Sequence, residues 1–320
     1  MRGELSTEEP VVVPTRAGDL AGIVRRPAGR ASAPGVVLVD GSGEGSKDEW
    51  GGWPEWIADC GVIVLRHDKP GCGGSPGDWR EQSFEDRADE SLAAATVLRS
   101  LPGVGPGVGL CGISQGGWVS LLAAARAPET VDFVVTISGP GVTPAEQERA
   151  RIARDLERHG IGGAERDEAL RWVDERTRRQ LAGEQAESIL ADQSELRGRS
   201  WYEVVIFGAY ENAGVLRFGA RIMDFDPLPA ARALRCPALV LFGGADDVVP
   251  VARSVELFAG ALPGLGDGLT AIAVFPCGSH GLFVADPDPD VPRRDQLAPG
   301  FLPMLEAFLA RAGAVRSGSG

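Results

Sequence analysis

Short apolar runs and helical stretches alternate at both ends of the chain. The apolar runs have the length of strands buried on both faces, and the stretches between them repeat apolar residues at the spacing of amphipathic helices. A parallel sheet covered by helices on both sides produces this alternation. The predicted strands are 36–39, 62–65, 108–111, 131–137, 238–242 and 269–275, and the predicted helices are 53–59, 84–99, 116–126, 252–262 and 301–311.

The middle of the chain breaks this alternation. Residues 143–225 are charged, helical in pattern and interrupted by glycines, with no convincing strand. We therefore predict an α/β fold whose mostly parallel central sheet is flanked by helices and carries an inserted helical cap. The predicted division is core in 1–141, cap in 142–226, core again in 227–314, and a flexible Ser-Gly tail in 315–320. We predict a turn at 103–109, before the strand at 108–111.

A candidate nucleophile lies where a predicted strand meets a predicted helix. The segment 112–116 reads Gly-Ile-Ser-Gln-Gly and matches the Gly-x-Ser-x-Gly elbow, in which a tight turn exposes the serine hydroxyl. The pattern alone is weak in a chain with 44 glycines. Its position between strand and helix favours Ser114 as a nucleophile over a structural serine that only caps a helix.

A second match to the same pattern is centred on Ser75. It has neither a strand before it nor a helix after it. The residue after the nucleophile must donate its backbone N–H to the oxyanion, and Pro76 has no N–H whereas Gln115 has one. Ser75 is therefore interpreted as a turn serine, and the Gln115 N–H is predicted to be one oxyanion donor.

A serine nucleophile needs an imidazole base, and the chain offers three histidines. Enzymes with this elbow place the triad in the order Ser, acid, His along the chain. His67 precedes the serine, and His159 lies among charged cap residues. His280, just beyond the last predicted strand, is therefore the predicted base, and Asp246 and Asp247 after the strand at 238–242 are the candidate acids.

The loop after the strand at 36–39 is rich in glycine and is the expected source of the second oxyanion donor. We assign this role to the Ser42 N–H. A phosphate-binding loop would also be Gly-rich, but Ser46 stands where such motifs require glycine.

Composition narrows the classes of function. The 320 residues carry a formal net charge of -13, which disfavours a nucleic-acid partner. No stretch approaches the ~20 apolar residues that span a bilayer, and no apolar signal core opens the chain. The five scattered cysteines are expected to be reduced thiols. We expect a cytoplasmic protein with a small-molecule acyl substrate, without nucleic-acid or membrane partners, that could form a homodimer.

From about Leu20 to the last helix, the sequence resembles bacterial α/β-hydrolases of the esterase and S9-peptidase-like type. Asp40 stands where that family usually has histidine, and by comparison the turn at 65–75 is a structural support. The segments that carry the resemblance are Gly41-Ser42-Gly43, the Arg-x-Asp-x-x-Gly-x-Gly-x-Ser turn within 65–75, 133–141, Asp226-Pro227-Leu228-Pro229, and the acid loop Gly-x-x-Asp-x-x-Val-Pro at 243–250.

The resemblance favours Asp246 over Asp247 as the acid, because Gly243, Asp246 and Val249 match the acid-loop pattern in register. It implies hydrolysis of a carboxylic ester, thioester or amide through an acyl-serine intermediate. No cofactor is implied, and the widely separated histidines disfavour a metal site.

The same scaffold can carry other functions. One alternative is an acyltransferase, cyclase or lyase of a biosynthetic pathway, and another is a non-enzymatic ligand-binding protein. In the cap, Trp201, Tyr202 and Tyr210 are candidates for binding the acyl group, although aromatic residues at such spacing also serve as packing core.

Overall fold

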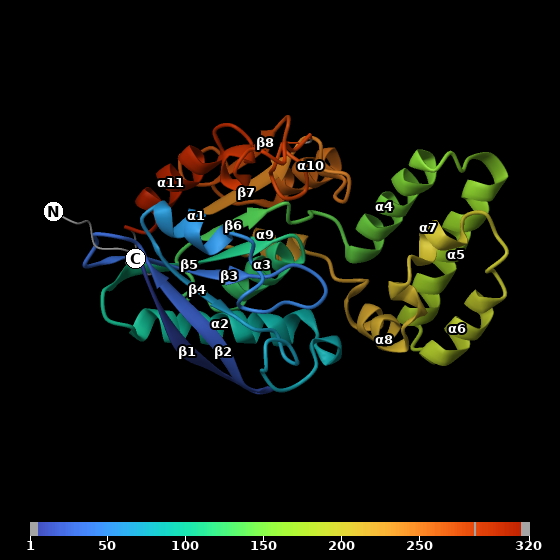
Figure 1. The fold of residues 1–320 in the computed structure, drawn as a ribbon, viewed down its shortest axis with the longest axis horizontal. Helices are drawn as coiled ribbons and strands as arrows, with labels where there is room; N and C mark the ends of the chain where they lie inside the picture. The colour runs from blue at the N-terminus through green and yellow to red at the C-terminus, as the bar shows by residue number, and fades with distance from the viewer. Residues whose placement is uncertain (1–5, 285, 315–320) are drawn as a thin grey trace.

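The computed structural model describes residues 6–284 and 286–314. Within them the strands form one eight-stranded sheet in the order β1-β2-β4-β3-β5-β6-β7-β8 (Figure 1). From β4 to β8 neighbouring strands are parallel, whereas the β1–β2 and β2–β4 pairs are antiparallel. The strands are β1 Thr7–Thr15, β2 Gly18–Arg26, β3 Ala33–Val39, β4 Ile63–His67, β5 Val104–Ile113, β6 Val134–Ile137, β7 Ala238–Gly243 and β8 Ala271–Phe275.

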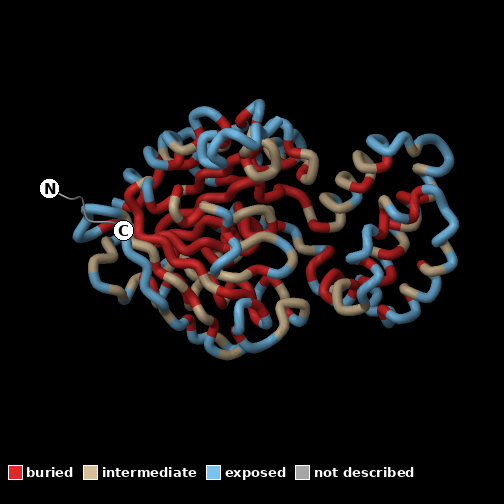
Figure 2. Tube along the Cα trace, viewed as in Figure 1, coloured by how far each residue is buried: buried red, intermediate tan, exposed pale blue. Residues whose placement is uncertain are grey.

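Helices cover both faces of this sheet, and each face has its own apolar core. Along β3, Val37 and Val39 join one core while Val36 and Leu38 join the other, because side chains alternate across a strand. The buried residues accordingly concentrate in the sheet (Figure 2). The first core is covered by α2 Phe84–Ser100, α3 Gln115–Arg126, α9 Leu228–Arg232 and α10 Val251–Ala261, and the second by α1 Trp53–Asp59 and α11 Phe301–Ala312.

Between β6 and β7 the chain leaves the sheet and forms a separate helical lobe (Figure 1). This lobe has a hydrophobic core of its own, built around Ile152, Leu156, Val173 and Trp201. Its helices are α4 Pro144–Arg158, α5 Gly163–Leu181, α6 Ala186–Ser194, α7 Tyr202–Ile206 and α8 Ala213–Ile222.

The expected α/β fold is therefore the observed one, with three local differences. The expected turn at 103–109 was wrong, because β5 already begins at Val104. The last strand is not buried on both faces: β8 is an edge strand, and Val274 is 43% exposed. The β1–β2 hairpin at the opposite edge was not predicted. Among the described residues, no helix is both long and apolar enough to cross a membrane.

Candidate active site

Ser114 occupies a sharp turn between β5 and α3. Its backbone has φ 53° and ψ -120°, a positive-φ conformation that a non-glycine residue rarely adopts. The turn is fixed on both sides: the Ser114 N–H donates to the Ile137 carbonyl at 2.8 Å, and the Gly117 N–H donates to the Ser114 carbonyl at 2.8 Å. The surroundings thus hold a strained serine at the carboxyl end of a central strand.

The two glycines of the elbow are required by close packing. A Cβ on Gly112 would overlap the Gly116 carbonyl, and a Cβ on Gly116 would overlap the Val39 carbonyl at the end of β3. Side chains at either position would push α3 away from the sheet. The elbow therefore lies directly against the loop that follows β3.

His280 and Asp246 are hydrogen-bonded to each other. The distance between His280 Nδ1 and Asp246 Oδ2 is 2.9 Å, and Asp246 Oδ1 accepts the backbone N–H groups of Val248 and Val249. Burial of the Asp246 carboxyl raises its pKa, but the interactions with His280 and the two N–H groups outweigh burial and leave the pKa below its ordinary value. The structure therefore favours an ionised Asp246 facing the imidazole.

The loops that carry this pair are joined through their backbones. The Gly244 N–H donates to the Phe275 carbonyl at 2.7 Å, and the Ala245 N–H donates to the Gly278 carbonyl at 2.9 Å. Asp247 is oriented differently: its side chain is 46% exposed and forms an ion pair with Arg158 at 2.9 Å. Of the two neighbouring aspartates, Asp246 is the one that contacts His280.

Ser114, Asp246 and His280 follow β5, β7 and β8, so all three lie beyond the carboxyl ends of parallel strands. In the part of the chain that the structure describes, no hydrogen bond joins Ser114 to His280. Hydrogen bonds between a nucleophile and its base are often long before a substrate is bound, so geometry of this kind is compatible with catalysis.

A cavity of about 510 Å³ opens above Ser114, and both expected oxyanion donors, Ser42 and Gln115, line it. Aromatic and aliphatic side chains form much of its wall: Trp79, Trp118, Phe207, Val215, Phe218, Ile222 and Met223. Polar side chains from α4 and from the short helical turn at Ala209–Glu211 complete it: Gln147, Glu148, Arg151 and Tyr210. The cavity is therefore mixed, with both apolar and charged walls.

Among the three aromatic residues expected to bind substrate, the structure places Tyr210 in this cavity. Trp201 and Tyr202 do not line the cavity; like Tyr210 they belong to the core of the helical lobe, and the Trp201 indole donates to Glu168 at 3.1 Å. Sequence reasoning missed Glu148 and Arg151, which form an ion pair at the cavity wall. Their i, i+3 spacing on α4 was the available signal, but it also fits a solvated helix face.

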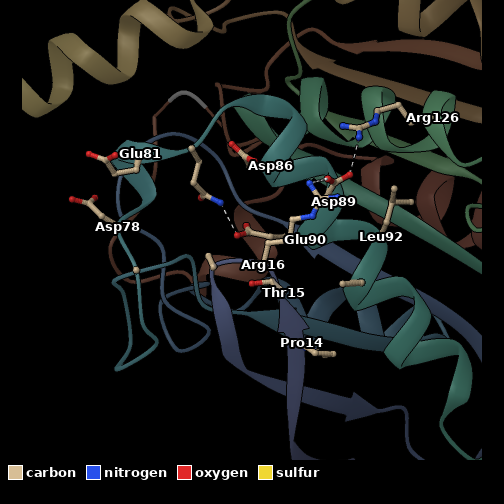
Figure 3. A pocket seen from close by; sticks show the side chains of 14 residues that line it. Pro14, Thr15, Arg16, Asp78, Glu81, Asp86, Asp89, Glu90, Leu92 and Arg126 are labelled. Carbon is tan, nitrogen blue, oxygen red and sulfur yellow. Dashed lines mark hydrogen bonds and ion pairs between the residues drawn. The ribbon is translucent and has the colours of Figure 1, made fainter.

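A larger hollow, of about 930 Å³, lies away from Ser114. It is bordered by the β1–β2 turn and by residues of α2, and Figure 3 shows Asp78, Glu81, Asp86, Asp89 and Glu90 around it. We assign no chemistry to it, because neither the elbow serine nor the Asp246–His280 pair borders it.

The discarded candidates have structural contacts. The Ser75 hydroxyl donates to Asp68 at 2.8 Å and accepts the Ala21 N–H at 2.9 Å, which ties a turn to β2. His67 and His159 each contact a nearby backbone carbonyl through Nδ1, at 2.8 and 2.7 Å.

Residues 27–291 match the model of the alpha/beta hydrolase family, and the chain belongs to that family. No curated protein matches the chain significantly.

Solved structures share the fold at low sequence identity. The alpha/beta hydrolase GrgF from Penicillium sp. sh18 has a TM-score of 0.61 and 17% identity, covering 97% of this chain and 100% of its own. Est1E from Butyrivibrio proteoclasticus, solved with ferulic acid, has a TM-score of 0.58 and 16% identity, covering 95% of this chain and 100% of its own. Proline iminopeptidase from Mycobacterium smegmatis has a TM-score of 0.59 and 18% identity, covering 95% of this chain and 99% of its own.

Proposed function

We propose that the protein is a serine hydrolase that cleaves a carboxylic ester, or a thioester or amide, through an acyl-Ser114 intermediate. The observation that carries the proposal is the hydrogen-bonded Asp246–His280 pair at the same sheet edge as the strained Ser114 elbow. An acid that orients an imidazole beside an exposed serine is the arrangement that activates a hydroxyl for acyl transfer.

In the proposed mechanism His280 Nε2 takes the proton of Ser114 as Oγ attacks the acyl carbon. Asp246 keeps the other ring nitrogen protonated and stabilises the imidazolium. The N–H groups of Ser42 and Gln115 stabilise the negative oxygen of the tetrahedral intermediate.

The intermediate collapses as His280 protonates the leaving alcohol, thiol or amine, which departs and leaves acyl-Ser114. A water molecule, deprotonated by His280, then attacks the acyl carbon. The second tetrahedral intermediate releases the carboxylic acid, and Ser114 recovers its proton.

We also propose that residues 142–226 act as a cap on a core formed by 1–141 and 227–314. Side chains of α4 and α8 line the Ser114 cavity together with core residues such as Trp118, which supports this division. A cavity of about 510 Å³ is in the usual range for small-molecule sites. The apolar and charged walls suit an acyl compound with an apolar body and one polar end.

The decisive experiment is labelling with a fluorophosphonate, followed by intact mass and peptide mapping, on the wild type and on His280→Ala. We expect one adduct, on Ser114, and none in the variant, because an unactivated serine reacts very slowly. A panel of p-nitrophenyl esters of increasing acyl length then defines the substrate range. A folded protein that takes no label would exclude an activated serine and favour a non-hydrolytic role.

A further inference from the structure

The loop that supplies Ser42 is held from behind by a buried lysine. Lys69 Nζ donates to the carbonyl oxygens of Gly41 and Gly43 at 2.6 and 2.7 Å, and it lies 3.5 Å from Asp40 Oδ2. Lys69 is only 4% exposed. The two carbonyls that flank Ser42 in sequence thus converge on one cation.

This contact fixes the direction of the Ser42 N–H. In a trans peptide the C=O and N–H bonds point in opposite directions, and the Gly41 carbonyl shares its peptide unit with the Ser42 N–H. Because the carbonyl points to Lys69, the N–H points away from Lys69. The nucleophile lies close to this peptide: a Cβ on Gly41 would be 3.6 Å from the Ser114 Cβ, and Ser42 lines the Ser114 cavity.

Arg87 on α2 links this loop to the second oxyanion donor. Its Nη2 donates to the Asp40 carbonyl at 2.7 Å, and its Nη1 donates to Gln115 Oε1 and, at 3.4 Å, to the Gly41 carbonyl. The guanidinium is buried. One side chain therefore contacts both segments whose N–H groups are proposed to bind the oxyanion.

The two cations lie in an environment that disfavours charge. Burial lowers the pKa of Lys69 to about 7 and also lowers the pKa of Arg87. Asp40 is the acid that approaches Lys69, and Glu90 is a second, more distant one. When Lys69 is protonated, it and Arg87 stabilise a negative charge that develops near the Gly41–Ser42 peptide, so their field acts in the direction that acyl transfer needs.

We propose that Lys69, together with Arg87, is a positioning residue that aims the Ser42 and Gln115 N–H groups at the oxyanion. The proposal rests on the proposed serine-hydrolase function. It assigns a role in transition-state stabilisation to a turn that the family resemblance makes only a structural support.

The test compares Lys69→Met with Lys47→Met, the same change at the only other lysine of the chain. Lys47 contacts Asp68 in the neighbouring turn and does not touch the Ser42 loop carbonyls. Active sites are counted by fluorophosphonate titration to the endpoint. We expect Lys69→Met to lower kcat about 100-fold per active site, near the loss of one oxyanion donor, with KM changed less than about threefold. Lys47→Met should stay within about threefold of the wild type.

A second readout separates positioning from a structural role. A trifluoromethyl ketone forms a tetrahedral adduct with an activated serine and places its oxyanion in the hole, so its inhibition constant should rise in parallel with the loss of kcat/KM. Because Lys69→Met leaves Asp40 without its cation, Asp40→Asn/Lys69→Met is measured as well, with thermal unfolding of each variant. This double variant should show the same loss of kcat.

Folded Lys69 variants that keep the wild-type kcat and the wild-type affinity for the ketone would overturn the inference and leave Lys69 with a structural role. That result differs from failure of the proposed function, which would appear in the wild type itself as absence of labelling at Ser114 and would overturn both.

Discussion

The guanidinium of Arg154 donates a hydrogen bond of 3.1 Å to the backbone carbonyl of Asp246. Arg154 belongs to α4 of the helical lobe, and Asp246 belongs to the loop after β7 and contacts His280. A second arginine of α4, Arg158, pairs with the Asp247 carboxylate at 2.9 Å. The lobe therefore supports the loop of the proposed acid directly, in addition to lining the cavity.

Removing the first of these contacts should weaken catalysis. Arg154→Met deletes a hydrogen bond to the peptide that carries Asp246, and such a bond contributes about 1 kcal/mol net. If this lost free energy allows His280 to leave its productive orientation, kcat/KM should fall about three- to fivefold. Arg158→Met is the matched control, because an exposed ion pair contributes little. In steady-state kinetics, kcat/KM should therefore fall more in Arg154→Met than in Arg158→Met. Equal rates would mean that α4 does not support the acid loop.

The two adjacent aspartates offer a sharper comparison. Asp246→Asn keeps the size of the side chain but replaces the carboxylate, which accepts the His280 Nδ1–H and so fixes the imidazole tautomer, with an amide. We therefore expect kcat to fall by about 10³- to 10⁴-fold. Asp247→Asn removes an exposed ion pair and should change kcat by less than about threefold. Both rates are measured with the same p-nitrophenyl ester. A reversed order would transfer the role of the acid to Asp247.

The residues of the candidate site that sequence could identify are those that follow strands. The elbow at Ser114, the aspartates after β7 and His280 after β8 each come from a short local pattern next to a buried apolar run. The parallel sheet then brings the ends of these strands to one edge, which is why local patterns sufficed.

The features that sequence could not supply depend on contacts between distant segments. Lys69 meets the Gly41 and Gly43 carbonyls, and Arg87 meets Gln115, only after the chain has folded. The β1–β2 hairpin was missed for a different reason. Its outer strand is largely exposed and contains Pro10 and Pro14, which an edge strand tolerates but which weaken the pattern of a buried strand.

Backbone strain at Ser114 should make a glycine at this position more stabilising than an alanine. Both Ser114→Ala and Ser114→Gly should abolish turnover, since each lacks the hydroxyl. Alanine keeps the cost of a positive φ, which is on the order of 1–3 kcal/mol, whereas glycine relieves it at an entropic cost of about 1 kcal/mol. The free energy of unfolding, measured in urea, should therefore be about 1 kcal/mol higher for Ser114→Gly than for Ser114→Ala. A less stable glycine variant would argue against stored strain at the elbow.

Ionisation of Glu90, on α2, should make the stability of the folded chain depend on pH. Its side chain is buried, and Gln82 Nε2 donates to its Oε1 at 2.6 Å. Burial raises the pKa of Glu90 from 4.5 to about 7 in the folded chain. The unfolded chain releases this proton at lower pH, so between these values the folded chain holds more protons. Rising pH in that range therefore favours unfolding.

Glu90→Gln should remove this pH dependence, because glutamine keeps a carbonyl acceptor for Gln82 and has no proton to lose. Relative to the wild type, the variant should gain on the order of 3 kcal/mol of unfolding free energy as the pH rises from about 5 to about 8. Urea unfolding across this range measures the gain, and Glu85→Gln, an exposed position on the same helix, should show no such trend. A difference between Glu90→Gln and the wild type that stays constant with pH would mean that the buried carboxyl ionises as readily in the folded chain as in the unfolded one.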